Sequence, residues 1–569
     1  MSDRRIAVYV CQCGGNIAEY VDVDRVIEAV KDSPGVRVAR NAMFTCSDAS
    51  QQEIIEDVTA EQLDGFVVAC CSPKLHTFTF RGVAERAGLN PYLCTHINIR
   101  EQCSWTHTDD PDGATRKAIK LVRAGIARAQ LSEALDPIVV NTTPRVAVIG
   151  GGVAGMRAAI GLADIGLGVY LIEREAALGG WVGGFGEMFP RRISGRALVE
   201  RMLEEIGRRP AISVFTNAEV VSKSGTYGNY RVVIGTAESR IEVTVGQIIV
   251  ATGFDSYEPE AGEFGYGGRG VVTLPEFKRL LDETEGPILH DGKPVGSVAY
   301  IYCVGSRGGD RAYCSRYCCT AAIHTSLLVA DRDPAVRQFH LYRDMRTYGR
   351  NELMFNESRK LGSLYLRFAD DDPPTVSPNG SGLKVKVHDL LTAGMELTVA
   401  ADLVVLVTGM VPRQDDGLVA TLKLPVGRDG FLNEIHPKLR PVETIVDGVL
   451  IAGACQAPKT SAESVASGLA AATQAGAVLK RGVASLDPQV AVVTEAACDG
   501  CGDCVAACPF GAIALDGSDR TRLATITAAG CKGCGACTPV CPTGAIDLQG
   551  YTDAQVRATI AGLLSRTAP

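Results

Sequence analysis

Hydrophobic positions along this chain follow an alternating strand-and-helix rhythm. The apolar run IAVYV at 6–10 predicts a buried strand, and DVDRVIEAV at 22–30 predicts a helix with one apolar face. A second apolar run, GFVVAC at 65–70, predicts another strand, and a helical pattern covers 114–135. Together these elements predict an α/β domain over residues 1–136.

Two linkers, marked by proline and polar residues, bound the next unit. They read DPIVVNTTP at 136–144 and LDPQVAVVTE at 486–495. Strand and helix patterns alternate between them, which predicts an α/β fold of two subdomains over 144–484. Within it, the polar run ADDDPPTVSPNGSG at 369–382 predicts an exposed loop.

Composition and charge narrow the possible partners and the compartment. Lys and Arg number 57 against 65 Asp and Glu, and the resulting net charge of −8 argues against nucleic acid or a membrane surface as partner. The longest apolar stretches are broken by Arg157 and Asp164 or are too short for direct membrane insertion. The start MSDRRIAVYV lacks a secretory pattern, so we expect a cytoplasmic protein whose 20 cysteines bind metal and form no disulfide framework.

Eight of the cysteines form two runs with identical spacing near the C-terminus. Each run reads C-x2-C-x2-C-x3-C-P, from 498 to 509 and from 531 to 542. Such runs bind two [4Fe-4S] clusters, and the fourth cysteine of each run ligates the other cluster. The predicted ligand sets are Cys498, Cys501, Cys504 and Cys541 for one cluster, and Cys531, Cys534, Cys537 and Cys508 for the other.

This pair of runs predicts an α+β electron-transfer domain of ferredoxin type over 490–550, followed by a tail at 551–569. The alternatives are structural zinc and disulfides. The repeated spacing and the trailing prolines argue against both.

A dinucleotide-binding fingerprint opens the middle unit. The strand RVAVIG at 145–150 leads into the glycines Gly150, Gly152 and Gly155, then a small-residue helix and a second strand that ends at Glu173. In this pattern the glycines allow a tight turn and close packing, and the acid accepts from ribose hydroxyls. We expect the start of the helix, at Val153 and Ala154, to present N–H groups to the phosphates.

Three further phrases resemble the thioredoxin reductase-like flavoproteins and favour FAD over NAD. They are LGGWVGG, QIIVATGF, and DGVLIAGAC before the helical run SAESVASGLAAA. The usual acid after the glycine of the third phrase is absent. The resemblance implies cofactor contacts at Gly179, Gly180, Ala251, Thr252, Gly253, Gly453 and Ala454.

In such reductases a second Rossmann unit binds the nicotinamide nucleotide. Here the corresponding segment, about 292–400, lacks the glycine fingerprint and instead carries four cysteines spaced C-x10-C-x3-C-C. This spacing can close on one cubane if the loop folds back over a helix start. A pair of small buried side chains remains the alternative for the adjacent cysteines, Cys318 and Cys319.

The N-terminal domain adds the phrases CQCGGNI, FTCS, ACCSPKLHTFTF and NIREQCSWTH. With CVGSR, YCSRYCC, VTGMVPR and the double ferredoxin runs, they occur in the same order as in the A-type subunits of heterodisulfide reductase and their bacterial relatives. The chain resembles that family over nearly its whole length. Longer members insert an extra ferredoxin-like domain into the flavin domain, and this chain, without a further cysteine quartet, resembles the short form.

The architecture implied by this resemblance has three parts. They are an N-terminal α/β cluster domain, a thioredoxin reductase-like FAD domain of two Rossmann units, and a C-terminal ferredoxin domain.

The resemblance also implies FAD and about four [4Fe-4S] clusters. One cluster would be held in the FAD domain by Cys303, Cys314, Cys318 and Cys319. Another would lie in the N-terminal domain, with Cys13, Cys46, Cys71 and Cys103 as preferred ligands. Cys11 is the fifth candidate, because two ligands in a C-x-C run are sterically awkward on one cubane. We expect Cys70, Cys94 and Cys455 to be small apolar side chains.

One position departs from the methanogen-type members of the family. Their helix after the cysteine pair reads CCxxALK, whereas this chain reads CCTAAIH, so His324 replaces a lysine near the flavin. His324 is therefore our candidate catalytic residue, because a titrating imidazole tunes a flavin differently from a permanent cation. A histidine that only packs on its helix is the alternative.

The implied function is electron transfer in a heterodisulfide reductase-like complex, by simple relay or by flavin-based bifurcation. The implied partners are BC-like catalytic subunits and an input partner of ferredoxin, hydrogenase or NADH-dehydrogenase type, with this chain a homodimer within the complex. Two alternatives remain: a quinone-linked module of a membrane-associated complex, and a free-standing NAD(P)H-linked flavoprotein reductase.

Overall fold

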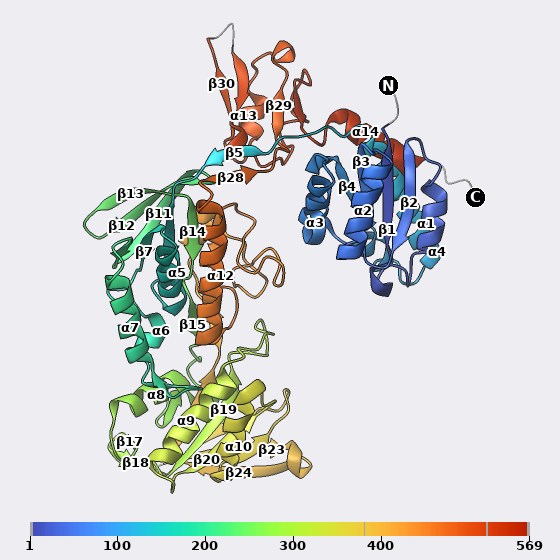
Figure 1. Ribbon diagram of the computed structural model, residues 1–569. Helices are drawn as coiled ribbons and strands as arrows, with labels where there is room; N and C mark the ends of the chain where they lie inside the picture. Colours follow the sequence, from blue (N-terminus) through green and yellow to red (C-terminus); the bar gives the residue numbers. More distant parts are fainter. Residues whose placement is uncertain (1–3, 381, 519–521, 566–569) are drawn as a thin grey trace. The chain divides into compact units, whose positions relative to one another are not determined.

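A computed structural model describes residues 4–380, 382–518 and 522–565. The chain divides into two compact units, each described here by itself (Figure 1). One unit joins Met1–Val140 to Ser485–Pro569, and the other is Asn141–Ala484. The two chain crossings fall within strands β5 (Ile138–Asn141) and β28 (Val483–Leu486).

The N-terminal part of the first unit is a four-stranded parallel sheet in the order β2-β1-β3-β4. Its two central strands, IAVYVC and GFVVAC, are buried along their whole length, as parallel strands covered by helices are. The strands are β1 Ile6–Cys11, β2 Val36–Ala42, β3 Gly65–Cys70 and β4 Cys94–Asn98. The helices are α1 Val23–Val30, α2 Asp48–Ala60, α3 Pro73–Arg86 and α4 Pro111–Ala129.

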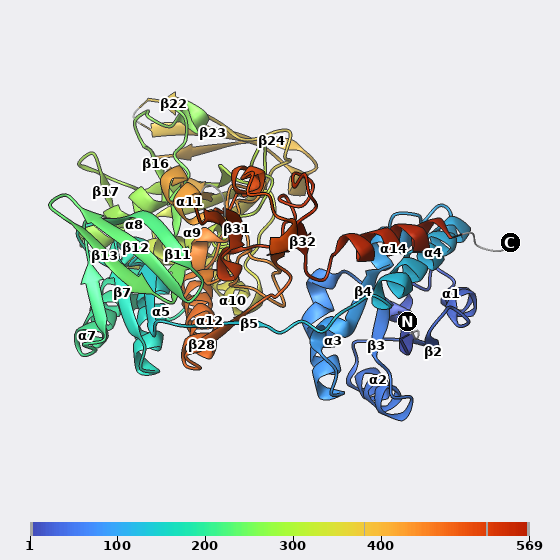
Figure 2. The same ribbon diagram turned by 90° about the horizontal axis from the view of Figure 1, so that it is seen from above.

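The segment after Gly550, expected only as a tail, forms helix α14 (Asp553–Leu564), which lies along α4 in both views (Figures 1 and 2). Gly562 allows the close approach, because a Cβ there would lie 2.7 Å from the Cα of Ala124. Arg128 stacks over Tyr551 with 3.9 Å between the guanidinium carbon and the ring centroid. The N-terminal domain is therefore completed by the far end of the chain.

The ferredoxin-type domain consists of two short hairpin-like pairs and one helix. Strand β29 (Ala491–Val493) pairs with β32 (Ile546–Leu548), and β30 (Ile513–Asp516) pairs with β31 (Leu523–Ile526). Helix α13 (Asp503–Ala507) contains Cys504 and ends just before Cys508. The pairing of the first strand with the last brings the two cysteine runs together across a small apolar core.

The first subdomain of the second unit contains the predicted Rossmann fold. Its parallel sheet has the order β10-β7-β6-β14-β27, and α5 follows β6 directly and packs on α12. Its elements are β6 Arg145–Ile149, α5 Val153–Asp164, β7 Gly168–Ile172, α6 Gly180–Gly183, β8 Glu187–Met188, β9 Ile193–Ser194, α7 Gly195–Gly207, β10 Ile212–Phe215, β11 Ala218–Thr226, β12 Asn229–Thr236, β13 Arg240–Val245, β14 Gln247–Val250, α11 Asp416–Leu422, β27 Val449–Ile451 and α12 Ser461–Leu479.

The second subdomain has its own five-stranded sheet, β16-β25-β19-β20-β21, and a three-stranded sheet, β22-β23-β24. Its elements are β15 Phe254–Ser256, β16 Val271–Thr273, α8 Leu274–Glu283, β17 Leu289–His290, β18 Lys293–Pro294, β19 Ser297–Val304, α9 Cys318–Arg332, β20 Arg337–Tyr342, α10 Glu352–Lys360, β21 Leu364–Arg367, β22 Thr375–Asn379, β23 Gly382–Asp389, β24 Met395–Ala401, β25 Leu403–Thr408 and β26 Met410–Pro412. The predicted exposed loop at 369–382 is wrong in part. Thr375–Asn379 pairs with β23, because alternate β23 residues bury apolar side chains that need a neighbouring strand.

Candidate functional site

A cavity of about 1350 Å³ lies in the second unit and is lined by residues of both subdomains. The three glycines of the fingerprint play two different roles at its edge. A Cβ at Gly150 would lie 2.3 Å from the carbonyl oxygen of Ala251, and one at Gly155 would lie 1.9 Å from that of Gly150. Gly152 instead lines the cavity beside open space. Two glycines thus close the turn and the third exposes backbone to a ligand.

The start of α5 and the acid of the fingerprint also reach the cavity. Val153 and Ala154 line it at the first turn of the helix. Glu173 ends just beyond β7, and its carboxylate accepts hydrogen bonds from the backbone N–H of Gly151 at 2.6 Å and of Glu175 at 2.9 Å. The acid is therefore held against the glycine turn.

The second glycine pair meets the first across a backbone bridge. Gly179 pairs with Gly152, and its N–H donates to the carbonyl oxygen of Gly151 at 2.8 Å. Gly179 and Gly180 both have positive φ, of 119° and 53°, and both line the cavity. The bend they make requires glycine, which explains their pairing in the sequence.

The remaining predicted contacts divide into lining and packing residues. Ala251, Thr252, Gly253 and Ala454 line the cavity. Gly453 lies behind it at φ 79°, where a Cβ would lie 2.8 Å from the Cβ of Ala154. Gly453 therefore acts by close packing of its turn on α5.

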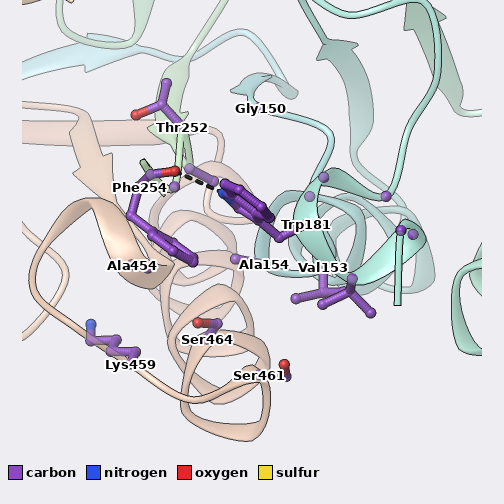
Figure 3. A pocket seen from close by; sticks show the side chains of 18 of the residues that line it. Gly150, Val153, Ala154, Trp181, Thr252, Phe254, Ala454, Lys459, Ser461 and Ser464 are labelled. Atoms are coloured by element: carbon purple, nitrogen blue, oxygen red, sulfur yellow. Dashed lines mark hydrogen bonds between the residues drawn. The ribbon is translucent and has the colours of Figure 1, made fainter. Parts of the chain in front are cut away.

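Two lining side chains were not predicted from the sequence. Trp181 stacks on Phe254 with ring centroids 5.7 Å apart, and its Nε1 donates to the Phe254 carbonyl oxygen at 3.1 Å (Figure 3). Lys459 also lines the cavity, its Nζ donating to Gln456, and burial lowers its pKa. The phrases LGGWVGG and CQAPK contained both residues, but nothing in those phrases showed that the two side chains point inward.

His324 lies in the cavity wall, on helix α9, with 5% of its surface exposed. Its Nε2 is 3.3 Å from Oε1 of Glu187, and its ring centroid is 6.0 Å from that of Phe189. Burial lowers the pKa of the imidazole, and the neighbouring Glu187 opposes that shift. The residue is thus both packed and in the cavity, so the two interpretations of it are not exclusive.

These observations fit a flavin dinucleotide. The cavity is larger than the about 300–1,000 Å³ of a drug-sized ligand pocket. A helix N-terminus, three glycine turns and the open space at Gly152 lie on its wall, which suits a pyrophosphate.

The four cysteines of the second subdomain lie at the end of β19 and the start of α9. Cys303 adopts a positive φ of 64° near the end of its strand, and Cys318 and Cys319 begin the helix. Cys318 interacts electrostatically with the other three thiols, and together with burial they raise its pKa. The structure thus brings the predicted quartet together: Cys303, Cys314, Cys318 and Cys319.

The five candidate cysteines of the N-terminal domain differ in their surroundings. Cys46 lies beside Cys11, Cys71 and Cys13, and their negative charges add to burial in raising its pKa. Cys103 is fully buried in the turn Arg100–Ser104; burial raises its pKa to about 11, and Lys117 is the cation that opposes this. Cys11, the fifth candidate, therefore interacts with Cys46, whereas no thiol contributes to the pKa of Cys103.

An arginine and a histidine complete the surroundings of the N-terminal set. Arg100 donates from Nη1 to Sγ of Cys13 at 3.6 Å, pairs with Glu101 at 2.7 Å and stacks over Trp105. Cys70, expected to be only a small apolar side chain, has its Sγ 3.0 Å from Nε2 of His96.

In the ferredoxin-type domain the interactions among the thiols match the crossed pattern at one of the two predicted sets. Cys504 interacts electrostatically with Cys501 and Cys498, which belong to its own run. Cys537 interacts with Cys531 and Cys534 and also with Cys508 from the other run. Backbone N–H groups donate to sulfur here: Ala491 to Cys531 at 3.5 Å, Ala512 to Cys508 at 3.3 Å and Ala545 to Cys541 at 3.2 Å.

Within the described ranges, no three His, Cys, Asp or Glu side chains converge on a position for one metal ion. A cubane has wider requirements, because each thiolate binds a different iron of the cluster. Buried polar atoms without a partner among the described residues occur beside two cysteine sets: Oγ1 of Thr45 next to Cys46, and Oγ1 of Thr320 next to Cys319. Free buried donors next to thiols fit a sulfide-bearing group.

No helix in the described part of the chain has the length and apolarity needed to cross a membrane.

Comparisons with known families match two of the three parts of the expected architecture. Residues 144–295 match the pyridine nucleotide-disulphide oxidoreductase family, and residues 497–548 match the 4Fe-4S dicluster domain family. The thioredoxin reductase of T. acidophilum is 17% identical and covers 59% of this chain and 99% of its own, with a TM-score of 0.40.

Curated relatives match nearly the whole chain, and each is an A-type subunit of a heterodisulfide reductase. The second iron-sulfur protein of this type from the CoB–CoM heterodisulfide reductase of Methanopyrus kandleri is 37% identical, over 90% of this chain and 91% of its own. The one from the H(2):CoB-CoM heterodisulfide,ferredoxin reductase of Methanothermobacter thermautotrophicus is 34% identical, over 91% of each chain. The one from the Ferredoxin/F(420)H(2)-dependent CoB-CoM heterodisulfide reductase of Methanosarcina acetivorans is 33% identical, over 90% of this chain and 75% of its own.

Proposed function

Because the chain belongs to the family of A-type heterodisulfide reductase subunits, we propose that it passes electrons between an input partner and BC-like catalytic subunits. The chain is a flavin and iron–sulfur oxidoreductase, and its cofactors are FAD and [4Fe-4S] clusters. The proposed input partner is of ferredoxin, hydrogenase or NADH-dehydrogenase type. We further propose a cytoplasmic location and a homodimer within the larger complex.

One observation carries this proposal. Helix α9 begins with Cys318 and Cys319, and His324 of the same helix lines the cavity. Five residues of helix rise about 7.5 Å, so one rigid element joins the cysteine quartet to the flavin site. Tyr317, next to Cys318, also lines the cavity. A cluster held by this quartet would lie within short electron-transfer range of the flavin.

Each region would contribute a separate part of the function. FAD supplies the exchange between two-electron and one-electron transfer when bound. The glycine turns and the start of α5 would hold its phosphates, and buried His324 with its half-buried partner Glu187 would hold or move a proton beside it. Whether transfer is a simple relay or bifurcation depends on partners that supply or remove the electrons.

We assign four clusters by their cysteines. Two belong to the crossed ferredoxin-type sets and one to Cys303, Cys314, Cys318 and Cys319. For the N-terminal cluster we now propose the ligands Cys11, Cys13, Cys46 and Cys71, since these thiols interact with one another.

Cofactor analysis of the anaerobically purified chain tests the assignments. We expect one FAD and roughly 16 iron, the sum of four cubanes. A value of about eight iron would reject the N-terminal and flavin-domain clusters together. The matched variants Cys11→Ala and Cys103→Ala then separate the two N-terminal ligand sets: the first should lose about four iron and the second should lose none. The opposite result would restore Cys103 as the ligand.

A further inference from the structure

Buried polar donors gather around the cysteine quartet of the flavin domain. Among the described residues, Oγ of Ser306, Nη1 of Arg307, Oγ1 of Thr320 and Nε of Arg343 are buried and have no hydrogen-bond partner. Buried polar atoms are nearly always paired in native proteins, so four such atoms near one site need an explanation. Ser306 and Arg307 follow Cys303 by three and four residues, Thr320 follows Cys319, and Nη2 of Arg343 donates to the carbonyl oxygen of Cys303 at 3.4 Å.

Arg307 is the donor whose position is best fixed. Its Nη2 donates to Oδ2 of Asp344 at 2.8 Å, and its backbone N–H donates to the carbonyl oxygen of Tyr313 at 3.0 Å. Arg343 binds the loop that contains Arg307. It donates to the carbonyl oxygens of Arg307 and Ser306 at 2.8 Å each. Only 15% of the Arg307 side chain is exposed. Its guanidinium is therefore anchored at one edge and free at the other.

Arg307 lies in the loop that begins at Cys303: the N–H of Ser306 donates to the Cys303 carbonyl oxygen at 3.2 Å, and Nη2 of Arg343 donates to the same oxygen at 3.4 Å. Burial raises the pKa of the Cys303 thiol, Cys319 raises it further, and the guanidinium groups of Arg343 and Arg307 lower it. Nη1 of Arg307 has no hydrogen-bond partner among the described residues, and the charges of Arg307 and Cys303 act on each other. The surrounding charge is positive: Asp344 is shared by Arg307, Arg346 and Arg367, and Asp370 lies 3.5 Å from Arg343.

We propose that Arg307 is a positioning residue that donates its free N–H to the sulfur of the flavin-domain cluster and raises the reduction potential of that cluster. This inference rests on the proposed function, because it requires a cluster at the quartet. Reduction adds one electron and no proton, so the site gains one negative charge. A buried cation with a hydrogen bond to sulfur stabilises the reduced form more than the oxidised form.

The test is an EPR-monitored redox titration of the full chain with four clusters and FAD. The Cys318→Ala variant first identifies the signal of this cluster by its loss. In Arg307→Gln the signal should persist with a more negative midpoint. At the wild-type midpoint we expect at least a tenfold lower ratio of reduced to oxidised cluster, which is 59 mV for a one-electron couple. Arg307→Lys should shift in the same direction by less, because it keeps the charge and loses the planar fork.

The matched control is Arg367→Gln. Arg367 contacts the same carboxylate, with Nη2 3.2 Å from Oδ1 of Asp344, but its side chain is 44% exposed. We expect its midpoint to equal the wild-type value. An unchanged midpoint in Arg307→Gln, with the signal retained, overturns the inference. If Arg307→Gln loses the cluster, an unchanged midpoint in Arg307→Lys overturns it instead. If the Cys318→Ala variant keeps every EPR signal of the wild type, the proposed cluster itself is rejected.

Discussion

The cysteine quartet of the flavin domain and the paired quartets of the ferredoxin-type domain are built differently. In the ferredoxin-type loops, the backbone N–H groups of Ala512 and Ala545 donate to the sulfur atoms of Cys508 and Cys541, each four residues earlier in the chain. In the flavin domain, guanidinium groups from two separate segments surround Cys303 and Cys319. The two ferredoxin-type loops thus surround sulfur with the same backbone donors. The cysteine quartet of the flavin domain instead has positive side chains that come from distant parts of the chain.

Removing one ligand from each region should break the comparison most strongly. We expect Cys318→Ala to lose about four of roughly 16 iron and to keep FAD, because its thiol holds only the flavin-domain cluster. Cys504→Ala should lose about the same amount of iron from the C-terminal domain. Iron and flavin analysis with EPR spectra checks both. If the two variants lose the same EPR signal, the regions do not hold separate clusters.

A change in the glycine turn should separate the cavity from its cluster. A Cβ at position 155 would lie 1.9 Å from the carbonyl oxygen of Gly150, so Gly155→Ala forces α5 away from its strand. We expect loss of FAD and a cost of about 1–3 kcal/mol in the stability of the second unit. Flavin absorbance and thermal unfolding measure these effects.

The control for this change is Gly207→Ala, at the end of α7, where a Cβ meets nothing within 4 Å. It should retain FAD at the wild-type level. If Gly155→Ala keeps its flavin, the fingerprint does not hold the cofactor.

In the N-terminal set, Arg100 should raise the reduction potential of its cluster by less than Arg307 does in the flavin domain. Arg100 donates to Sγ of Cys13, but Glu101 neutralises part of its charge at 2.7 Å. We therefore expect Arg100→Gln to make the midpoint of the N-terminal cluster more negative by less than Arg307→Gln does for the flavin-domain cluster. The same redox titration measures both. A larger shift in Arg100→Gln would contradict the ranking by net charge.

The smallest expected effect is a pH dependence at the flavin site. Burial lowers the pKa of His324 below its ordinary 6.5, so the unfolded chain binds this proton more readily than the folded chain. Stability from this group is complete above about pH 6.5 and falls as the pH decreases toward the folded pKa. His324→Gln should flatten this acid decline, seen in thermal unfolding from pH 7 to pH 5.

An identical acid decline in His324→Gln and the wild type would assign the effect to another buried group, such as His340, whose pKa burial lowers to about 3.

The parts of the molecule that the sequence predicted well are those fixed by short spacing. The fingerprint glycines and the ferredoxin runs each fold within a few residues, so their spacing alone specifies the turn. The choice between Cys11 and Cys103 could not be made in this way, because it depends on where β1 ends relative to the turn at Arg100–Ser104. The strand order of the sheet determines this relative position, and the residues around each cysteine do not indicate it.

Residues that act from a distance could not be found in the sequence. Arg307 is placed by Asp344, which lies on the next strand connection, and Trp181 is placed by Phe254. Helix α14 was also missed. Its capping box at Thr552 and Gln555 is a local signal, but its packing on α4 is not. Each of these features depends on a partner far away along the chain.

The packing of α14 on α4 has a consequence for synthesis. Gln555 donates to the carbonyl oxygen of Leu131 at 2.9 Å, and Arg128 donates to that of Gly550 at 2.8 Å. These contacts of α4 can form only after the C-terminal residues have been synthesised. At ordinary translation rates this interval is about 20–90 s. During this interval the face of α4 that α14 later covers is exposed. The nascent N-terminal domain is therefore uncovered on the side of α4 that points away from its sheet.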